Sequence, residues 1–304
     1  MNSTKILALI FVGYVAIAFL PSCSVVQQGA DILTATGQIS ESDKKAIVQT
    51  SQAVQATFAE ITEEQEYYIG RGVAALILSR YKVYDNPSLN TYINTVGQTI
   101  VYFSDRPEIY AGYHFLVLDT EEVNALSAPG GLIFITRGLL QRCKNEEMLA
   151  DVLAHEVGHV SAKHGLQSIK KSRLLELFSI IGKEAATRYG PEQLAHLTNL
   201  YSDTLGDIVD TLILRGYDRK FEYQADSLAV KFSSTAGYSP QGLVDFLRTM
   251  VGDTSAVSEK GWFKTHPTSE QRTGKIQTEV ASLKTDLRGE PVRTKRFQKA
   301  VAGL

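Results

Sequence analysis

Two histidines and a glutamate stand close together in the segment His155-Glu156-Val157-Gly158-His159. Four residues advance an α-helix about 40° beyond one full turn, so both imidazoles can point the same way and share one tetrahedral zinc ion. Glu156 then lies on the flank, where it can take a proton from an attacking water and return it to a leaving amine. The H-E-x-x-H spacing predicts one zinc ion bound by His155 and His159, with Glu156 as general base and acid for peptide hydrolysis. Two core histidines beside a salt-bridging glutamate are the alternative.

A catalytic zinc ion needs three protein ligands and one open position, so a third ligand must come from elsewhere in the chain. We expect Glu222 in this role, because residues 217–236 have the pattern of a second helix. Asp226 follows by four residues and faces the same way. It can therefore accept a hydrogen bond from a ligand histidine and fix its tautomer. An exposed acidic pair beside neighbouring basic residues is the alternative.

The histidine pair requires a helix, and residues 145–165 have the pattern of one. Asn145 is a suitable N-cap, Glu146 and Glu147 suit the first turn, and Gly165 suits the end. Apolar residues on three of its sides predict that this helix runs through the core, where its polar group needs partners.

The remaining elements are predicted from changes in hydrophobic period. Residues 60–81 and 87–103 have helical spacing, whereas 114–118 and 132–136 are apolar and β-branched, as in strands. Pro129-Gly130-Gly131 is a turn signal between the strands. We therefore expect a mainly α fold with a small antiparallel β-sheet, an α+β arrangement with the H-E-x-x-H helix at its centre.

Three separated motifs resemble those of one family of zinc peptidases. The motifs are His155 to His159 followed by His164-Gly165, then Glu222 to Asp226, and finally Thr265-His266-Pro267-Thr268. The family has the HExxH and ExxxD motifs of gluzincins. It includes the CAAX prenyl endopeptidases, bacterial membrane heat-shock proteases and periplasmic lipoprotein proteases. The resemblance covers about residues 65 to 285 and implies a zincin-like zinc metalloendopeptidase. Its substrates would be misfolded or misassembled envelope proteins, including those bound for the outer membrane.

The resemblance also extends to the stretch before the zinc helix. It implies that Gly130, Gly131, Leu132, Ile133 and Phe134 bind substrate. A strand at a sheet edge beside the zinc can pair with an extended substrate through main-chain hydrogen bonds, and the glycines allow close approach. The alternative is a hairpin turn that enters a core strand.

His266 has several possible roles. By resemblance it belongs to the active site, where its imidazole can stabilise the oxyanion of the tetrahedral intermediate or occupy the open zinc position at rest. A surface histidine in a turn before Pro267 is the alternative. Arg215 and Arg219 are further candidates for contact with an oxyanion, and His164 is predicted to be a helix-end residue favoured by the dipole.

The N-terminus has the architecture of a secretory signal. Ile6 to Leu20 is an apolar run after Lys5, and the residues before Cys23 resemble a bacterial lipobox. We expect a lipoprotein signal peptide at residues 1–22 and lipidation of Cys23, which would place the protein on the periplasmic side of the outer membrane. An uncleaved membrane anchor and a cytosolic protein with a buried N-terminal helix are the alternatives.

The rest of the chain divides by composition. We expect a tether or N-terminal helix at 23–59, the zinc peptidase domain at 60–285 and a basic, solvated C-terminal tail at 286–304. Segments within 166–214 have helical patterns and form either a lid over the cleft or extra helix packing. No later apolar run reaches membrane-spanning length, which indicates the soluble, lipid-anchored branch of the family.

Whole-chain composition excludes several classes of protein. The 304 residues include 31 basic and 33 acidic side chains, a formal net charge of -2, and only two cysteines. Disordered proteins and disulfide scaffolds are excluded, and no charge field favours nucleic acid.

The competing function is a zinc-containing chaperone or assembly adaptor of the outer membrane with latent or no proteolysis. A prenyl-protein protease is a third interpretation, weakened by the missing membrane-spanning helices.

Overall fold

The computed structural model describes residues 30–37, 40–45, 61–169, 209–210, 216–251, 262–266, 270–283 and 288–304. The chain divides into two compact units, Met1–Ile61 and Thr62–Leu304. The signal segment 1–22, Cys23 and most of the expected lid at 166–214 lie outside the described residues. In the part that is described, no helix has both the length and the apolar character needed to cross a membrane.

The described part of the first unit contains helical turns at 30–35 and 41–45. Ser40 begins the second of these, because its hydroxyl accepts a hydrogen bond from the Asp43 N–H. An ion pair of 2.7 Å joins Lys44 to Asp31.

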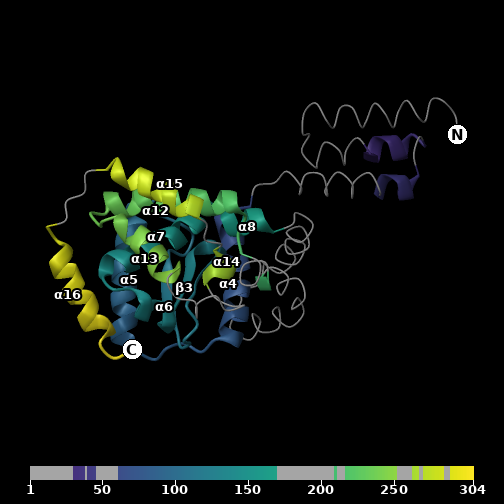
Figure 1. The fold of residues 1–304 in the computed structure, drawn as a ribbon. Coiled ribbons are helices and arrows are strands. Elements are labelled where there is room, and N and C mark those ends of the chain that lie inside the picture. The colour runs from purple at the N-terminus through teal and green to yellow at the C-terminus, as the bar shows by residue number, and fades with distance from the viewer. Residues whose placement is uncertain are drawn as a thin grey trace. The chain divides into compact units, whose positions relative to one another are not determined.

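The second unit is mainly helical (Figure 1). Its strands are β1 (His114–Leu118), β2 (Ala125–Ala128) and β3 (Leu132–Thr136), with a 3₁₀ turn η1 (Pro129–Gly131) between β2 and β3. Its described helices are α4 (Glu63–Arg80), α5 (Pro87–Tyr102), α6 (Arg137–Arg142), α7 (Glu146–Ser161), α8 (His164–Ser168), α12 (Arg219–Thr235), α13 (Gln241–Val251), α14 (Trp262–Thr265), α15 (Glu270–Ala281) and α16 (Glu290–Val301). The expected mainly α fold with a small sheet is confirmed.

The sheet is mixed, which corrects the expectation of a purely antiparallel one. Its strand order is β1-β3-β2, with β3 antiparallel to β2 and parallel to β1. The tight η1 turn reverses the chain between β2 and β3, and it needs positive φ angles of 72° at Gly130 and 87° at Gly131. This reversal makes β3 antiparallel to β2, and on its other side β3 pairs in parallel with β1.

This strand order also corrects the expectation that residues 132–136 form the edge of the sheet. Both sides of β3 are paired, so its main chain has no free edge for a substrate. The outer side of β1 is closed by side chains of α5. The Asn94 amide exchanges two hydrogen bonds with the Phe115 main chain, and Asn90 accepts one from the Val117 N–H. Within the described sheet, β2 is the remaining edge.

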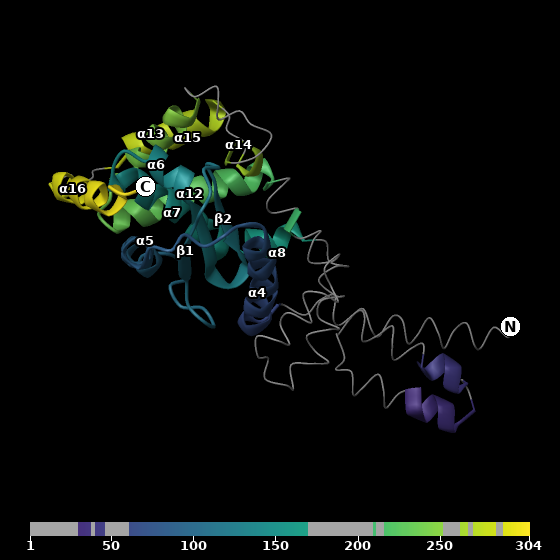
Figure 2. The ribbon, with the colours of Figure 1, turned by 90° about the horizontal axis from the view of Figure 1, so that it is seen from below.

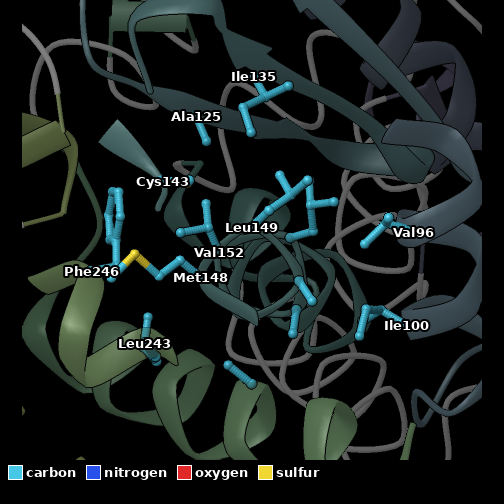
Figure 3. Close-up of a cluster of buried hydrophobic side chains, with 14 of the residues drawn as sticks. Val96, Ile100, Ala125, Ile135, Cys143, Met148, Leu149, Val152, Leu243 and Phe246 are labelled. Carbon is cyan, nitrogen blue, oxygen red and sulfur yellow. The ribbon is translucent and has the colours of Figure 1, made fainter. Parts of the chain in front are cut away.

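Helix α7 passes through the core of the second unit, as its sequence predicted. Asn145 caps it by accepting a hydrogen bond from the Met148 N–H, and every residue from Glu146 to Val160 is buried. Figure 3 shows its residues Met148, Leu149 and Val152 between the strand residues Ala125 and Ile135 on one side and Leu243 of α13 on another. The histidine helix is therefore held by packing on all sides.

The C-terminal residues form a docked helix, which corrects the expectation of a solvated tail. Phe297 of α16 is 2% exposed. Arg293 pairs with Glu147 at 2.5 Å, and the Arg296 Nε donates to Glu146 at 2.7 Å. Figures 1 and 2 both show α16 and α4 at opposite ends of the second unit. Two arginines of α16 thus pair with the first turn of the helix that carries the histidines.

Candidate metal centre

Four side chains from three elements converge in the core. His155 and His159 come from α7, Glu222 from the first turn of α12, and His266 from the residue after α14. Each offers one ligand atom, and these four atoms lie within 4.8 Å of one another. Helices α7 and α12 approach closely because Gly158 has no side chain. A Cβ there would lie 3.2 Å from the Ala225 carbonyl oxygen.

The three predicted ligands have the spacing of a tetrahedral site. The Nε2 atoms of His155 and His159 are 3.0 Å apart, and the Glu222 oxygens lie 3.4 Å from His159 Nε2 and 3.7 Å from His155 Nε2. Ligand atoms about 2.1 Å from a tetrahedral zinc ion are separated by about 3.4 Å. Two imidazoles and a carboxylate at this spacing fit such an ion.

Glu156 supports the same fit. The side chain is completely buried, and neither carboxylate oxygen has a hydrogen-bond partner among the described residues. Among the described residues, its polar neighbour is His266, whose Nε2 lies 3.4 Å from Glu156 Oε1. A buried carboxylate that accepts no hydrogen bond is costly, so it indicates a missing donor such as a water molecule at the metal.

His266 lies inside the cluster. The side chain is 1% exposed, which rules out a surface turn residue. Its Nδ1 is 3.1 Å from Glu222 Oε1 and 3.3 Å from His155 Nε2. The ring stacks on Trp262 at 4.3 Å, and the His266 N–H donates to the Trp262 carbonyl. These contacts bring His266 into one cluster with Glu222 and His155.

Asp226 contacts His155, as its spacing from Glu222 predicted. Its Oδ1 is 3.0 Å from His155 Nδ1, which leaves His155 Nε2 to face the metal position. A carboxylate on Nδ1 fixes the tautomer and makes Nε2 a better metal donor.

Arg272 of α15 is a residue of the site that the sequence analysis missed. It is 2% exposed, and its Nη1 lies 2.7 Å from Glu222 Oε2. Its Nε and Nη2 bind the two Asp226 oxygens at 2.7 and 2.8 Å. One guanidinium therefore neutralises both acidic residues of α12, a requirement that two buried carboxylates four residues apart could have signalled.

Burial and charge set the protonation states of the cluster. Burial favours a higher pKa for Glu222, but His266, His159 and Arg272 together hold its pKa well below the usual range. Burial keeps the pKa of His159 well below its ordinary value, so its imidazole is neutral. Burial also lowers the pKa of His266, but Glu222 and Glu156 outweigh it and raise that pKa. A neutral His159 and an ionised Glu222 are the forms that bind a cation.

The outer nitrogen of His159 has its own support. His164 Nδ1 is 2.9 Å from His159 Nδ1, and His164 Nε2 contacts the Gln224 side chain at 3.1 Å. His164 begins the short helix α8 and is not one of the four clustered ligands. The Tyr217 ring, also missed by the sequence analysis, stacks on His159 at 4.0 Å. Arg219 is exposed at the start of α12, and Arg215 lies outside the described residues.

Known proteins share the region that builds this cluster. Residues 87–280 match peptidase family M48. The chain is 26% identical over 214 residues to the Beta-barrel assembly-enhancing protease of Escherichia coli (strain K12), which covers 68% of this chain and 41% of that protein. It is 27% identical over 187 residues to the Mitochondrial metalloendopeptidase OMA1 of Schizosaccharomyces pombe, covering 61% and 51%.

A third relative is Metalloprotease YcaL of Escherichia coli (strain K12), 29% identical over 171 residues, with 56% of this chain and 63% of that protein covered. The match thus spans between 41% and 63% of the lengths of these three relatives. The family match covers more than half of this chain and includes all four clustered side chains and Glu156. The resemblance noted from the motifs is confirmed: the chain belongs to peptidase family M48.

Proposed function

We propose that this protein is a zinc-dependent endopeptidase that hydrolyses peptide bonds with a metal-activated water. The observation that carries the proposal is the buried carboxylate of Glu156, which accepts no hydrogen bond from the described residues and lies beside the converged ligand atoms. A structural zinc site has no need of a general base, whereas a peptidase does.

Each side chain has a defined task in this proposal. His155, His159 and Glu222 hold the zinc ion, and Asp226 orients His155. Zinc bound there supplies a Lewis acid that polarises the substrate carbonyl and activates water. Glu156 takes the proton of the attacking water and passes it to the leaving amine.

His266 has two alternative roles in this proposal, one in the resting enzyme and one during catalysis. Its place among the ligand atoms allows it to occupy the fourth position around the metal, which would leave the enzyme latent. Its Nε2 lies 3.4 Å from Glu156, which supports donation to the oxyanion that forms on the substrate carbonyl as its other role. In both roles, His266→Ala changes activity while bound zinc is retained. A chaperone or assembly adaptor with a permanently capped zinc is the competing function. The position of His266 among the ligand atoms is the observation that favours it.

The substrates we propose are misfolded or misassembled envelope proteins. One relative is named for enhancing β-barrel assembly and another as a mitochondrial metalloendopeptidase, so proteins are the shared class of substrate. Recognition through main-chain hydrogen bonds tolerates many sequences and therefore suits unfolded chains. The strand β2, which is the remaining edge of the described sheet, supports such recognition, with Gly130 and Gly131 at its end. The predicted Leu132, Ile133 and Phe134 would then shape the sheet behind that edge.

The central experiment compares zinc content and casein cleavage in the wild-type chain without residues 1–22 and in Glu156→Gln. We expect equal zinc content and a loss of cleavage of at least a hundredfold in the variant. Glu121→Gln is the matched control, because Glu121 is exposed and pairs only with Arg137 in the described contacts. Equal cleavage by wild type and Glu156→Gln would refute the mechanism. Zinc binding without cleavage by either protein would favour the adaptor.

We further propose that Cys23 is lipidated after removal of residues 1–22 and anchors the protein to the periplasmic face of the outer membrane. Palmitate labelling of wild type and Cys23→Ala tests the anchor. Cys143→Ala is the control, because Cys143 is the other cysteine in the sequence and is buried in the core. Label that survives Cys23→Ala would reject the proposal.

A further inference from the structure

The outward-facing main-chain groups of β2 follow from the register of the sheet. The Thr136 N–H donates to the Asn124 carbonyl at 3.0 Å, so Asn124 and Thr136 form a hydrogen-bonded pair. Such pairs alternate along an antiparallel ladder, so Leu126 and Ala128 also bond to β3. The N–H and C=O groups of Ala125 and Ser127 therefore face away from the sheet.

The outer edge of β2 is bounded at both ends. At its start, the Trp262 N–H donates to the Val123 carbonyl at 2.7 Å. At its other end, the Tyr217 hydroxyl lies 3.4 Å from the Ser127 carbonyl oxygen, which the register places on the outer side. Among the described contacts, Tyr217 is the partner of that carbonyl, and Ala125 lies between the two occupied positions.

Tyr217 connects this edge to the metal centre. Its ring is 7% exposed and stacks on the ligand His159 at 4.0 Å with an interplanar angle of 17°. Its N–H donates to the Thr265 carbonyl, next to His266. Tyr217 and His159 line a small pocket with Ser127, whose hydroxyl is buried without a hydrogen-bond partner. The Ser127 hydroxyl can therefore make a further hydrogen bond, and it lies beside Tyr217, which already contacts His159.

We propose that Tyr217 is a substrate-positioning residue whose hydroxyl occupies, in the free enzyme, the Ser127 carbonyl that an extended peptide needs for pairing with β2. The inference rests on the proposed peptidase function. An N–H of the incoming peptide replaces the phenol on Ser127, and the phenol turns into the pocket beside His159. The hydroxyl thus competes with the peptide main chain and takes no part in bond cleavage.

The competition predicts a specific kinetic change. At 3.4 Å this contact is longer than a normal O–H···O hydrogen bond and therefore weak, so its removal in the free enzyme makes peptide binding about twofold to fivefold tighter. Tyr217→Phe keeps the ring on His159 and removes the hydroxyl. We expect KM for a fluorogenic peptide to fall about twofold to fivefold, with kcat within twofold of wild type and zinc content unchanged.

Tyr113→Phe is the matched control. Tyr113 is also a buried tyrosine whose hydroxyl donates to a main-chain carbonyl, that of Arg106 at 3.0 Å, and it belongs to neither β2 nor the metal cluster. We expect its KM and kcat to equal those of wild type. A second measurement uses Glu156→Gln, in which fluorescence anisotropy of the same peptide gives Kd without cleavage. Adding Tyr217→Phe to this protein lowers Kd by the same factor.

Three results would overturn the inference. They are an unchanged KM and Kd, a higher KM, or a kcat that falls a hundredfold at constant KM, which would assign the hydroxyl to the reacting carbonyl. Absence of peptide cleavage by wild type is a different outcome, because it refutes the proposed peptidase function itself. The two failures are therefore distinguishable.

Discussion

In the metal-free protein, Arg272 compensates the buried charges of Glu222 and Asp226. Replacing Arg272 tests whether this compensation stabilises the fold. Arg272→Met removes the guanidinium that lies within 2.8 Å of both Glu222 and Asp226 and keeps most of the apolar volume. Both carboxylates are at most 2% exposed. Breaking a buried ion pair by removing one partner costs about 3–5 kcal/mol, because the remaining charge stays buried and uncompensated.

Zinc should reduce this loss, because a bound cation takes over the compensation of Glu222 while Asp226 keeps its contact with His155. For a domain of this size, 1 kcal/mol shifts Tm by about 2–4 °C. We therefore expect Arg272→Met to lower Tm by about 6–20 °C in EDTA and by less than half of that with excess zinc.

Circular dichroism melts of the two metal states provide the assay. Arg219→Met is the matched control, since Arg219 is exposed at the start of the same helix as the two acids. Its Tm should stay within about 2 °C of wild type, as surface substitutions usually do. A Tm loss for Arg272→Met below about 2 °C in EDTA, or one that is equal with and without zinc, would refute the reasoning.

Three further predictions concern the supports of the site. Gly70→Ala should destabilise the protein by about 2 kcal/mol or more in urea unfolding, because its Cβ would lie 1.8 Å from the Pro129 carbonyl oxygen. The free energy of unfolding of Asp151→Asn, relative to that of wild type, should increase as pH rises from 5 to 8. Burial raises the Asp151 pKa in the folded state, so the wild type loses stability as pH rises through that value, and urea unfolding at both pH values measures the gap. Arg296→Met should lower Tm because Glu146 is fully buried, whereas Lys299→Met, on the same helix, should leave it unchanged.

The parts of the site that sequence predicts are those set by local geometry. His155 and His159 are one helical repeat apart, as are Glu222 and Asp226, so each pair shares a helix face before any tertiary contact forms. His266 was assigned to the active site by its motif, and the structure places it beside Glu222. Its exact role depends on distances to groups on other helices, which spacing along one segment does not contain.

The order of the strands could not be derived from the same patterns. Residues 132–136 were expected at the sheet edge, yet the unbroken apolar run Leu-Ile-Phe-Ile suits a strand covered on both faces. Strand order is fixed by the connections. The η1 turn makes β3 the neighbour of β2, and the amides of α5 close the outer side of β1. The remaining edge of the described sheet therefore falls on β2, whose four residues give too short a pattern to be recognised as a strand.

The arginines that neutralise buried acids were not predicted, because each of them lies far from its acidic partner in the sequence. Glu146 and Glu147 suit the first turn of an isolated helix, and a solvated pair needs nothing more. Once α7 is buried, those same carboxylates require counter-charges, and α16 supplies them from nearly 150 positions away, beyond the residues 87–280 that match the family. Arg272 meets the same need at Glu222. Burial of the helix that carries the ligands thus creates the demand for distant arginines. A buried acid without a local base is therefore the sequence signal that predicts such partners.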